Sequence, residues 1–182
     1  MNPKVVILLA NGFEEIEAVV PIDVFRRLDF DVVIAGAEKI VTGSHKLMLP
    51  ADLLINQVNV NEFDAFILPG GMPGSINLRD NPAVIDIVKE AFSSGKIIGA
   101  ICAAPIVLLK AGILRGKKAT AHPSIKNELE GVLYTMAMTE SSGNIITSKG
   151  PGASFEFAAK IAEMLGKGKE AKELLVSMFV KT

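Results

Sequence analysis

Hydrophobic residues along this chain form short continuous runs that alternate with segments of helical spacing. Residues 5–10, 31–35, 64–68 and 97–101 are predicted to be buried strands, because each run is mostly apolar and is bounded by turn residues or charges. Helical spacing predicts helices over residues 15–28, from Asn81-Pro82 onward, over 105–110, and in two closing segments at 154–165 and 169–180.

The segments between these elements are shorter and less regular. Residues 40–51 are predicted to form a hairpin that turns near Gly43-Ser44. Short strands are expected at 119–121, 135–139 and 145–148, with a helix near 124–129. This alternation is typical of an α/β protein with a mostly parallel sheet and helices on both faces. No internal repeat or linker interrupts it, so residues 1–182 are predicted to form one domain.

Composition and charge exclude several classes of protein. With 49% hydrophobic and 21% charged residues the chain is globular in composition rather than disordered. A formal net charge of -1 and the lack of a Lys/Arg-rich run give no reason to expect nucleic acid or an anionic membrane as a partner. The single cysteine cannot form an internal disulfide, so the fold does not need an oxidising compartment.

The apolar runs do not predict targeting or membrane insertion. The first run is short and has no basic region ahead of it, which indicates a strand rather than a signal peptide. The longest apolar stretch, residues 97–109, contains Pro105 and is too short to span a bilayer. We therefore expect a cytoplasmic protein with no membrane partner.

Cys102 stands out because it follows a buried strand and directly precedes a helix. A lone cysteine in apolar surroundings is usually a small core residue. Here, however, backbone N–H groups at the helix start favour a thiolate. A helix terminus alone shifts a pKa by about 1.5 units at best. Further donors are therefore needed, and the N–H groups of Gly70-Gly71 and a protonated carboxyl group are the candidates for a thiol that is ionised at neutral pH.

Carboxyl and imidazole groups lie at other predicted strand ends. Glu17 is on the helix just after the first strand, in a turn crowded by two further glutamates, and we interpret it as a buried, protonated partner of the thiol. His122 follows a short strand and is either a loop residue bonded to backbone or a general acid/base beside the thiol. His45, in the predicted hairpin turn, is expected to be a surface or interface residue.

Five motifs in this chain resemble the DJ-1/ThiJ/PfpI superfamily, and specifically its DJ-1 branch. They occur in the family's order and cover nearly the whole sequence. The motifs are Gly12-Phe13-Glu14-Glu15-Ile16-Glu17, Leu68-Pro69-Gly70-Gly71, Ala100-Ile101-Cys102-Ala103-Ala104-Pro105, Thr120-Ala121-His122-Pro123, and Thr147-Ser148-Lys149-Gly150-Pro151-Gly152-Ala153-Ser154-Phe155-Glu156-Phe157.

The resemblance implies a flavodoxin-like three-layer sandwich with a cysteine nucleophile elbow. In the family's pattern, Cys102 matches the oxidisable nucleophile, Glu17 its protonated hydrogen-bond partner, and His122 the nearby histidine. Gly71 and Ala103 match residues that supply backbone N–H groups to the pocket.

The resemblance also implies a homodimer. Asp23 and Arg27 match first-helix residues at the dimer contact, where Asp23 orients His122 of the other subunit. The hairpin departs from the family, because this chain has Gly43 and His45 where close relatives carry cysteine and arginine. The family's polar contact across the dimer at that point is therefore not expected in the same form.

Two functions follow from these expectations, and both use the same sulfur. The first is a glyoxalase or deglycase type of enzyme that acts on small carbonyls such as methylglyoxal, without a cofactor or metal. The second is an oxidation-sensing, stress-protective chaperone in which Cys102 becomes a sulfinate. Cysteine peptidase or amidotransferase activity is a weaker alternative, because those sites usually place histidine next to the nucleophile and position 103 here is alanine.

Overall fold

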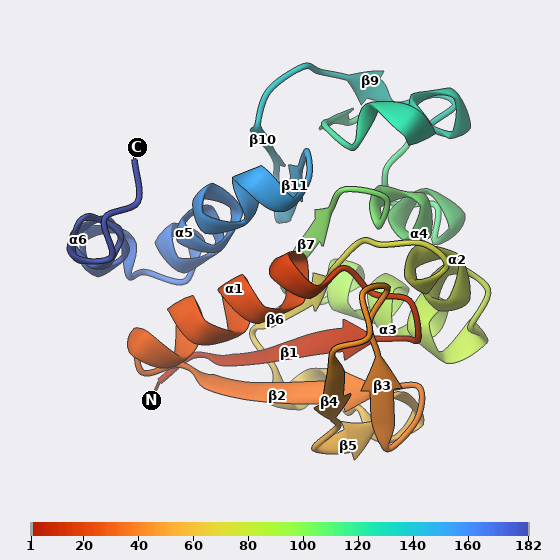
Figure 1. The fold of residues 1–182 in the computed structure, drawn as a ribbon. Coiled ribbons are helices and arrows are strands. Elements are labelled where there is room, and N and C mark those ends of the chain that lie inside the picture. Colours follow the sequence, from red (N-terminus) through yellow and green to blue (C-terminus); the bar gives the residue numbers. More distant parts are fainter. Residues whose placement is uncertain (1, 182) are drawn as a thin grey trace.

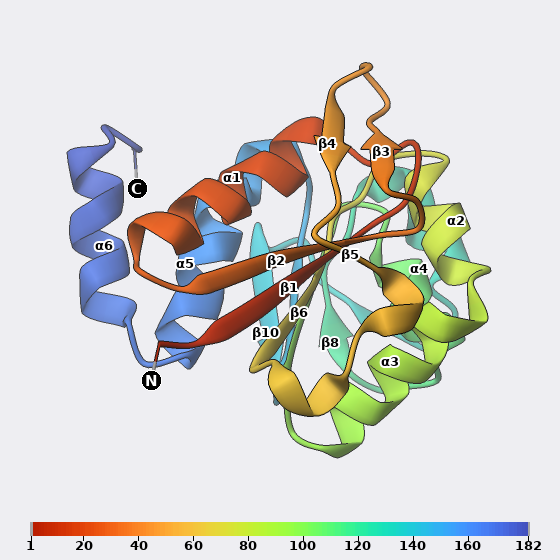
Figure 2. The same cartoon turned by 90° about the horizontal axis from the view of Figure 1, so that it is seen from below.

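The structure is a computed structural model that describes residues 2–181. A central sheet lies between two layers of helices, as Figures 1 and 2 show. Helices α1, α5 and α6 cover one face, and α2, α3 and α4 cover the other. This arrangement confirms the predicted α/β class with helices on both faces.

Seven strands form the central sheet, in the order β10-β11-β7-β6-β1-β2-β5. Only β10 runs antiparallel to its neighbour; the other strand pairs of the sheet are parallel. Two pairs, β3-β4 and β8-β9, form separate small sheets. The strand bounds are β1 Lys4–Leu9, β2 Asp31–Gly36, β3 Ile40–Thr42, β4 Met48–Pro50, β5 Leu53–Leu54, β6 Ala65–Leu68, β7 Ile97–Ile101, β8 Lys118–Ala119, β9 Leu133–Tyr134, β10 Thr139–Ser142 and β11 Ile145–Ser148.

Helices α1 to α4 lie between strands along the chain, and α5 and α6 follow the last strand. Their bounds are α1 Glu15–Arg27, α2 Gly74–Arg79, α3 Pro82–Ser93, α4 Pro105–Lys110, α5 Ser154–Met164 and α6 Gly168–Ser177. Four short 3-10 helices add Ile55–Gln57, Val60–Glu62, Pro123–Glu128 and Pro151–Ala153. No helix among residues 2–181 has both the length and the apolar character needed to cross a bilayer.

The core is divided by the sheet because successive side chains of a strand point to opposite faces. In β1, Val6 and Leu8 pack with α2, α3 and α4, whereas Val5 and Ile7 pack with α1, α5 and α6. All four are fully buried. Continuous apolar runs therefore mark strands that are covered on both faces, as the sequence pattern predicted.

One predicted strand, at residues 135–139, is wrong. Residues 135–138 form no strand, and β10 begins only at Thr139. The backbone there bonds to unrelated partners rather than to one ladder. The Thr135 N–H donates to Ala119, the Thr120 hydroxyl donates to Ala137, and the Lys149 N–H donates to Met138.

Other differences are smaller. The segment predicted as a helix near 124–129 is the 3-10 helix Pro123–Glu128, the last helix ends at Ser177, and the strand expected at 119–121 is β8. Helix α2 and strand β5 were not predicted. Helix α2 has only six residues and starts at a glycine, so it shows little helical periodicity.

The layer formed by α5 generates a stability prediction. Phe157 of α5 is fully buried against the sheet, and a Cβ added at Gly99 of β7 would lie 2.7 Å from the Phe157 ring. We expect Phe157→Ala to lower the free energy of unfolding by about 3–5 kcal/mol, because it leaves a cavity in a closely packed core. Urea unfolding followed by circular dichroism measures this change.

Phe179 provides the matched control, because its side chain is 93% exposed. Phe179→Ala should change the free energy of unfolding by no more than about 0.5 kcal/mol. Equal losses in the two variants would contradict the packing described for α5.

Candidate active site

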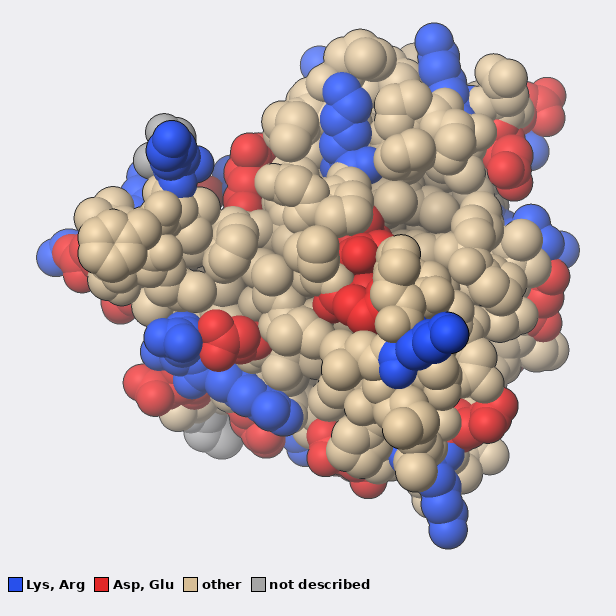
Figure 3. Space-filling view, viewed as in Figure 1, with Lys and Arg blue, Asp and Glu red and all other residues tan. Residues whose placement is uncertain are grey.

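The loops that follow four neighbouring strands meet at one edge of the sheet. Strands β11, β7, β6 and β1 lie side by side, and their carboxyl ends point the same way (Figure 1). Ligand sites of parallel sheets lie at this edge. In the same view, Figure 3 shows a small group of acidic side chains near the middle of this face, surrounded by uncharged surface.

Cys102 is the first residue after β7, and its backbone is in the left-handed region with φ of 64°. A non-glycine residue adopts this conformation at an energetic cost, so the surrounding structure has to hold it. The Cys102 N–H donates to the Ser148 carbonyl at 2.8 Å, and the Cys102 carbonyl accepts from the His122 N–H at 2.9 Å. Helix α4 starts at Pro105, so the residue is a strained turn between strand and helix, as in other nucleophile elbows.

Glu17 lies in the first turn of α1 with no solvent exposure. Its Oε2 accepts a hydrogen bond from the Gly70 N–H at 2.8 Å. Its Oε1 is buried and has no hydrogen-bond partner among the described residues. The Cys102 side chain lies close enough for the two groups to shift each other's pKa. The contact therefore allows one proton to be shared between the carboxyl group and the sulfur.

Burial and this contact shift both pKa values. Burial raises the pKa of Glu17 to about 7, although the hydrogen bonds from Cys102 and Gly70 act in the opposite direction. Burial and the charge of an ionised Glu17 raise the pKa of the Cys102 thiol, and the N–H groups of Ala103 and Gly71 oppose that rise. The prediction that donors bring the thiol below its ordinary pKa is therefore wrong in direction.

The pair is best described by how many protons it holds. Below a pH of about 7, Glu17 and Cys102 both keep their protons. Above it one proton remains and is shared, because two adjacent buried anions are unfavourable. A thiolate forms at neutral pH only when the shared proton is on Glu17, and the raised pKa of Cys102 opposes that arrangement. The protonated Glu17 beside a thiolate stays a prediction from the sequence.

Glycines allow the segments that carry Gly70, Glu17 and Cys102 to approach one another closely. A Cβ at Gly70 would lie 2.5 Å from Glu17 Oε2 and 2.7 Å from the Cys102 Cβ. Gly71 has φ of 92°, a conformation that favours glycine, and its N–H reaches the sulfur. The Pro69-Gly70-Gly71 motif is thus explained by contact with both reactive groups.

His122 is brought to the site through its backbone. Its imidazole is exposed and bonds to Ser124 rather than to Cys102. The Nδ1 atom lies 2.7 Å from the Ser124 hydroxyl and accepts from the Ser124 N–H at 3.2 Å. Because Nδ1 accepts a hydrogen bond from Ser124, the neutral imidazole of His122 carries its proton on Nε2.

Asp23 and Arg27 are not part of this cluster. They form an ion pair of 2.8 Å on the outer side of α1, and about half of each side chain is exposed.

His45 lies at the tip of the β3–β4 hairpin and bonds to Glu15. The Glu15 carboxylate accepts from the His45 N–H at 2.5 Å and contacts His45 Nδ1 at 2.9 Å and the Ser44 hydroxyl at 3.2 Å. Burial raises the pKa of Glu15, and these hydrogen bonds outweigh it, so the pKa lies below its ordinary value. Glu14 lies close to both residues. These hydrogen bonds join the tip of the β3–β4 hairpin to the first residue of α1. We therefore interpret them as contacts that hold the hairpin against the helix.

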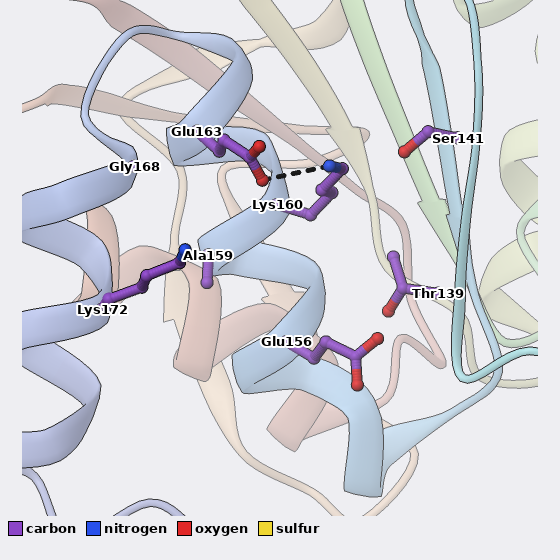
Figure 4. Close-up of a pocket in the computed structure, with 8 residues that line it drawn as sticks. All are labelled: Thr139, Ser141, Glu156, Ala159, Lys160, Glu163, Gly168 and Lys172. Atoms are coloured by element: carbon purple, nitrogen blue, oxygen red, sulfur yellow. Dashed lines mark hydrogen bonds and ion pairs between the residues drawn. The ribbon is translucent and has the colours of Figure 1, made fainter. Parts of the chain in front are cut away.

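Two hollows on the described surface lie away from this cluster. One of about 330 Å³ lies between α5, α6 and β10, and Figure 4 shows Glu156, Lys160, Glu163 and Lys172 around it. A more apolar one of about 660 Å³, on the outer side of α5 and α6, is lined in part by Phe155. The residues lining both hollows do not include Cys102 or Glu17. Cys102 itself is partly exposed.

Two residues that contribute to the site were not predicted from the sequence. Ser148 holds the Cys102 backbone through its carbonyl, and Ser124 holds the His122 ring. A backbone carbonyl can accept a hydrogen bond whatever the side chain is, so the residue type does not reveal this contact. The Ser148 contact follows from the pairing of β11 with β7, which depends on the strand order.

The raised pKa of Glu17 predicts a pH-dependent stability. The folded state keeps a proton on Glu17 up to a pH of about 7, whereas the unfolded chain loses it near its ordinary value of 4.5. This contribution to stability is complete below 4.5 and is lost as the pH rises through 7. The loss is about 3 kcal/mol. Urea unfolding at several pH values measures it.

Glu17→Gln removes this titration but keeps an oxygen that accepts from Gly70. Between pH 4.5 and 8 the free energy of unfolding of the wild type should fall by about 3 kcal/mol, whereas that of Glu17→Gln should not change through this residue. Parallel pH curves for the two proteins would show that Glu17 is not held in its neutral form.

Comparison with known proteins agrees with this geometry. The model of the DJ-1/PfpI family matches residues 3–164. Protein dj-1beta of Drosophila melanogaster is 38% identical over 184 residues, which cover 99% of this chain and 98% of the relative. A protein named as a deglycase, from Pyrococcus horikoshii, is 34% identical over 165 residues, covering 89% of this chain and 99% of its own.

Solved structures show the same fold. The crystal structure of Drosophila melanogaster DJ-1beta matches with a TM-score of 0.95 and 36% identity over 100% of both chains. The structure of oxidized Toxoplasma gondii DJ-1 matches with a TM-score of 0.93 and 38% identity, over 99% of this chain and 100% of the other. The fold is the flavodoxin-like arrangement of these relatives, and the chain belongs to the DJ-1/PfpI family.

Proposed function

We propose that this chain is a cofactor-independent enzyme of the glyoxalase or deglycase type that acts on small reactive carbonyls through Cys102. The observation that carries the proposal is the close approach of the buried Glu17 carboxyl group, with its pKa raised to about 7, to Cys102. In this proposal the two groups share one proton near neutral pH. The relative named as a deglycase supports an enzymatic role for this family. In this proposal residues 1–182 act as one domain, in the cytoplasm, where reducing conditions keep the single cysteine a thiol.

The first step of the proposed reaction transfers the shared proton. The Cys102 thiolate attacks the aldehyde carbon of methylglyoxal, and the C=O π electrons move to oxygen. The N–H groups of Gly71 and Ala103, which face the sulfur, stabilise the developing oxyanion. The alkoxide then takes the proton from Glu17, which leaves a neutral hemithioacetal and a carboxylate.

The remaining steps use that carboxylate as a base. Glu17 removes the proton from the former aldehyde carbon, and the C–H electrons form an enediolate. Return of the proton to the neighbouring carbon, with transfer of the hydroxyl proton from the former aldehyde carbon to the neighbouring oxygen, gives a thioester of lactate. Water hydrolyses the thioester and releases lactate, the thiol and one proton. The sum is methylglyoxal plus water giving lactate and a proton, with no net oxidation. In the deglycase variant, the same sulfur attacks an adduct of the carbonyl on a protein.

His122 has a different role from Glu17 in this scheme. Because its Nδ1 accepts from the Ser124 N–H, the neutral ring presents an N–H at Nε2. It can donate a hydrogen bond to a substrate oxygen, so Glu17 is the better base. In this scheme Glu17 is therefore the acid and base, and His122 is a hydrogen-bond donor to the substrate.

A homodimer completes the proposal. Ile16 and Val19 of α1 are 50% and 39% exposed, next to the Asp23–Arg27 ion pair. Apolar side chains on the outer side of the first helix fit the dimer contact that the family resemblance implies. In that contact Asp23 orients His122 of the other subunit.

A second candidate function is oxidation sensing by the same sulfur, with the stress-protective role expected from the sequence. The partly exposed Cys102 and a solved relative described as oxidized favour it. Two molecules of hydrogen peroxide convert the thiolate to a sulfinate and yield two molecules of water. A protonated Glu17 would then donate its hydrogen bond to a sulfinate oxygen.

The enzyme proposal predicts lactate formation from methylglyoxal without glutathione. Cys102→Ala should abolish this activity, because it removes the attacking atom. Glu17→Gln should lower kcat by about 10²- to 10⁴-fold, because it removes the acid and base. Phe179→Ala should behave as wild type. Equal rates for Cys102→Ala and wild type would end the proposal.

The sensing proposal predicts a stable gain of two oxygens on Cys102 after mild peroxide treatment, measured by intact mass and peptide mapping. Glu17→Gln should yield less sulfinate, because an amide is a weaker donor than a carboxylic acid. The chain has seven methionines as internal competitors. Oxidation scattered over them, with Cys102 unchanged, would contradict sensing.

A further inference from the structure

Glu14 lies at the start of α1 and is hydrogen-bonded to both Glu17 and Gly70. Its Oε2 accepts from the Glu17 N–H at 2.8 Å and so caps the helix. Its own N–H donates to the Gly70 carbonyl at 2.9 Å. The Gly70 N–H in turn donates to Glu17 Oε2 at 2.8 Å. These bonds close a ring of three residues around the carboxyl group of Glu17.

The charged groups around Glu17 are few. Cys102 from the elbow and Glu14 are the titratable groups that bear on it. The Glu15–His45 pair on the hairpin lies further out. Helix α5 packs along α1, and its Glu156, Lys160 and Glu163 line the hollow toward α6 and β10 (Figure 4).

We propose that Glu14 is a positioning residue of this site. Its carboxylate fixes the turn that carries Glu17, and its negative charge favours the arrangement in which Glu17 keeps the shared proton and the sulfur is the anion. This inference rests on the proposed sharing of one proton between Glu17 and Cys102.

The direction of the effect follows from which group Glu14 meets. The negative charge of Glu14 bears on Glu17, whereas the charge that bears on Cys102 is that of Glu17. A second charge beside an ionised Glu17 is unfavourable, whereas Glu14 is not among the charges that raise the pKa of Cys102. Glu14 therefore moves the negative charge of the pair toward the sulfur, which is the atom that attacks the substrate.

The test is the pH dependence of alkylation of the full-length protein by iodoacetamide, followed by intact mass. Cys102 is the single cysteine, so the signal has one source. In the wild type the rate should rise with pH to a plateau, with a midpoint near 7. Glu17→Gln should raise that midpoint, because only the thiol is then left to ionise.

Glu14→Gln keeps an oxygen that can cap the helix but removes the charge. Both the midpoint and the plateau rate should fall, the plateau by about threefold or more, because the carboxylate form of Glu17 gains population. The low-pH limb of the curve should stay unchanged. Glu14→Asp keeps the charge and a good capping group and should resemble the wild type. Glu15→Gln, one residue along, is the matched control and should leave the midpoint in place.

Loss of the helix cap alone does not give this pattern. Glu14→Ala should lower the urea midpoint as well as the alkylation plateau, whereas Glu14→Gln should lower mainly the plateau. An unchanged profile for Glu14→Gln, or an equal shift in Glu15→Gln, would overturn the role of Glu14. If Glu17→Gln still moves the midpoint in that case, the proposed function stands. If it does not, both fall.

Discussion

The close approach of the buried Glu17 carboxyl group and the Cys102 sulfur is the constraint on which this site depends. Neither group is a good nucleophile or base when it is neutral and isolated. Burial disfavours a second negative charge, so the pair gives up one proton near neutral pH and holds the other strongly. The site therefore has one anion and one acid at the same time. The position of the remaining proton decides whether Glu17 or Cys102 is the anion.

The fold holds these two groups together against several costs. Cys102 is in a strained backbone conformation, and Glu17 is fully buried. Hydrogen bonds from β11 and from the segment of His122 fix the strained residue, and Gly70 fixes the carboxyl group. Each of these partners comes from a different strand end. Only a sheet that places β11, β7, β6 and β1 side by side brings them together, so the large apolar core maintains the small polar site.

Much of this could be predicted from residues alone. Apolar runs gave the main strands, because strands covered on both faces have no polar side. Cys102 was found because it directly follows a strand, and Glu17 because it lies on the helix that comes after the first strand. The failures have a common cause. The strand expected at 135–139 and the direction of the thiol pKa both depend on what faces a group in space. A helix start predicts donors for Cys102, but only the structure shows that burial and Glu17 outweigh them.

In the proposed scheme, the sharing of one proton also lets the same site serve both proposed functions. A carbonyl substrate needs the thiolate to attack and the acid to protonate the new oxygen, which is then the base that removes a proton from carbon. Peroxide needs only the thiolate, and the acid afterwards binds the sulfinate. The two reactions diverge after the first attack, at the point where Glu17 either gives up its proton or keeps it. Any charge that sets the preference of Glu17 for the proton therefore changes the balance between the two reactions, and Glu14 is the nearest such charge.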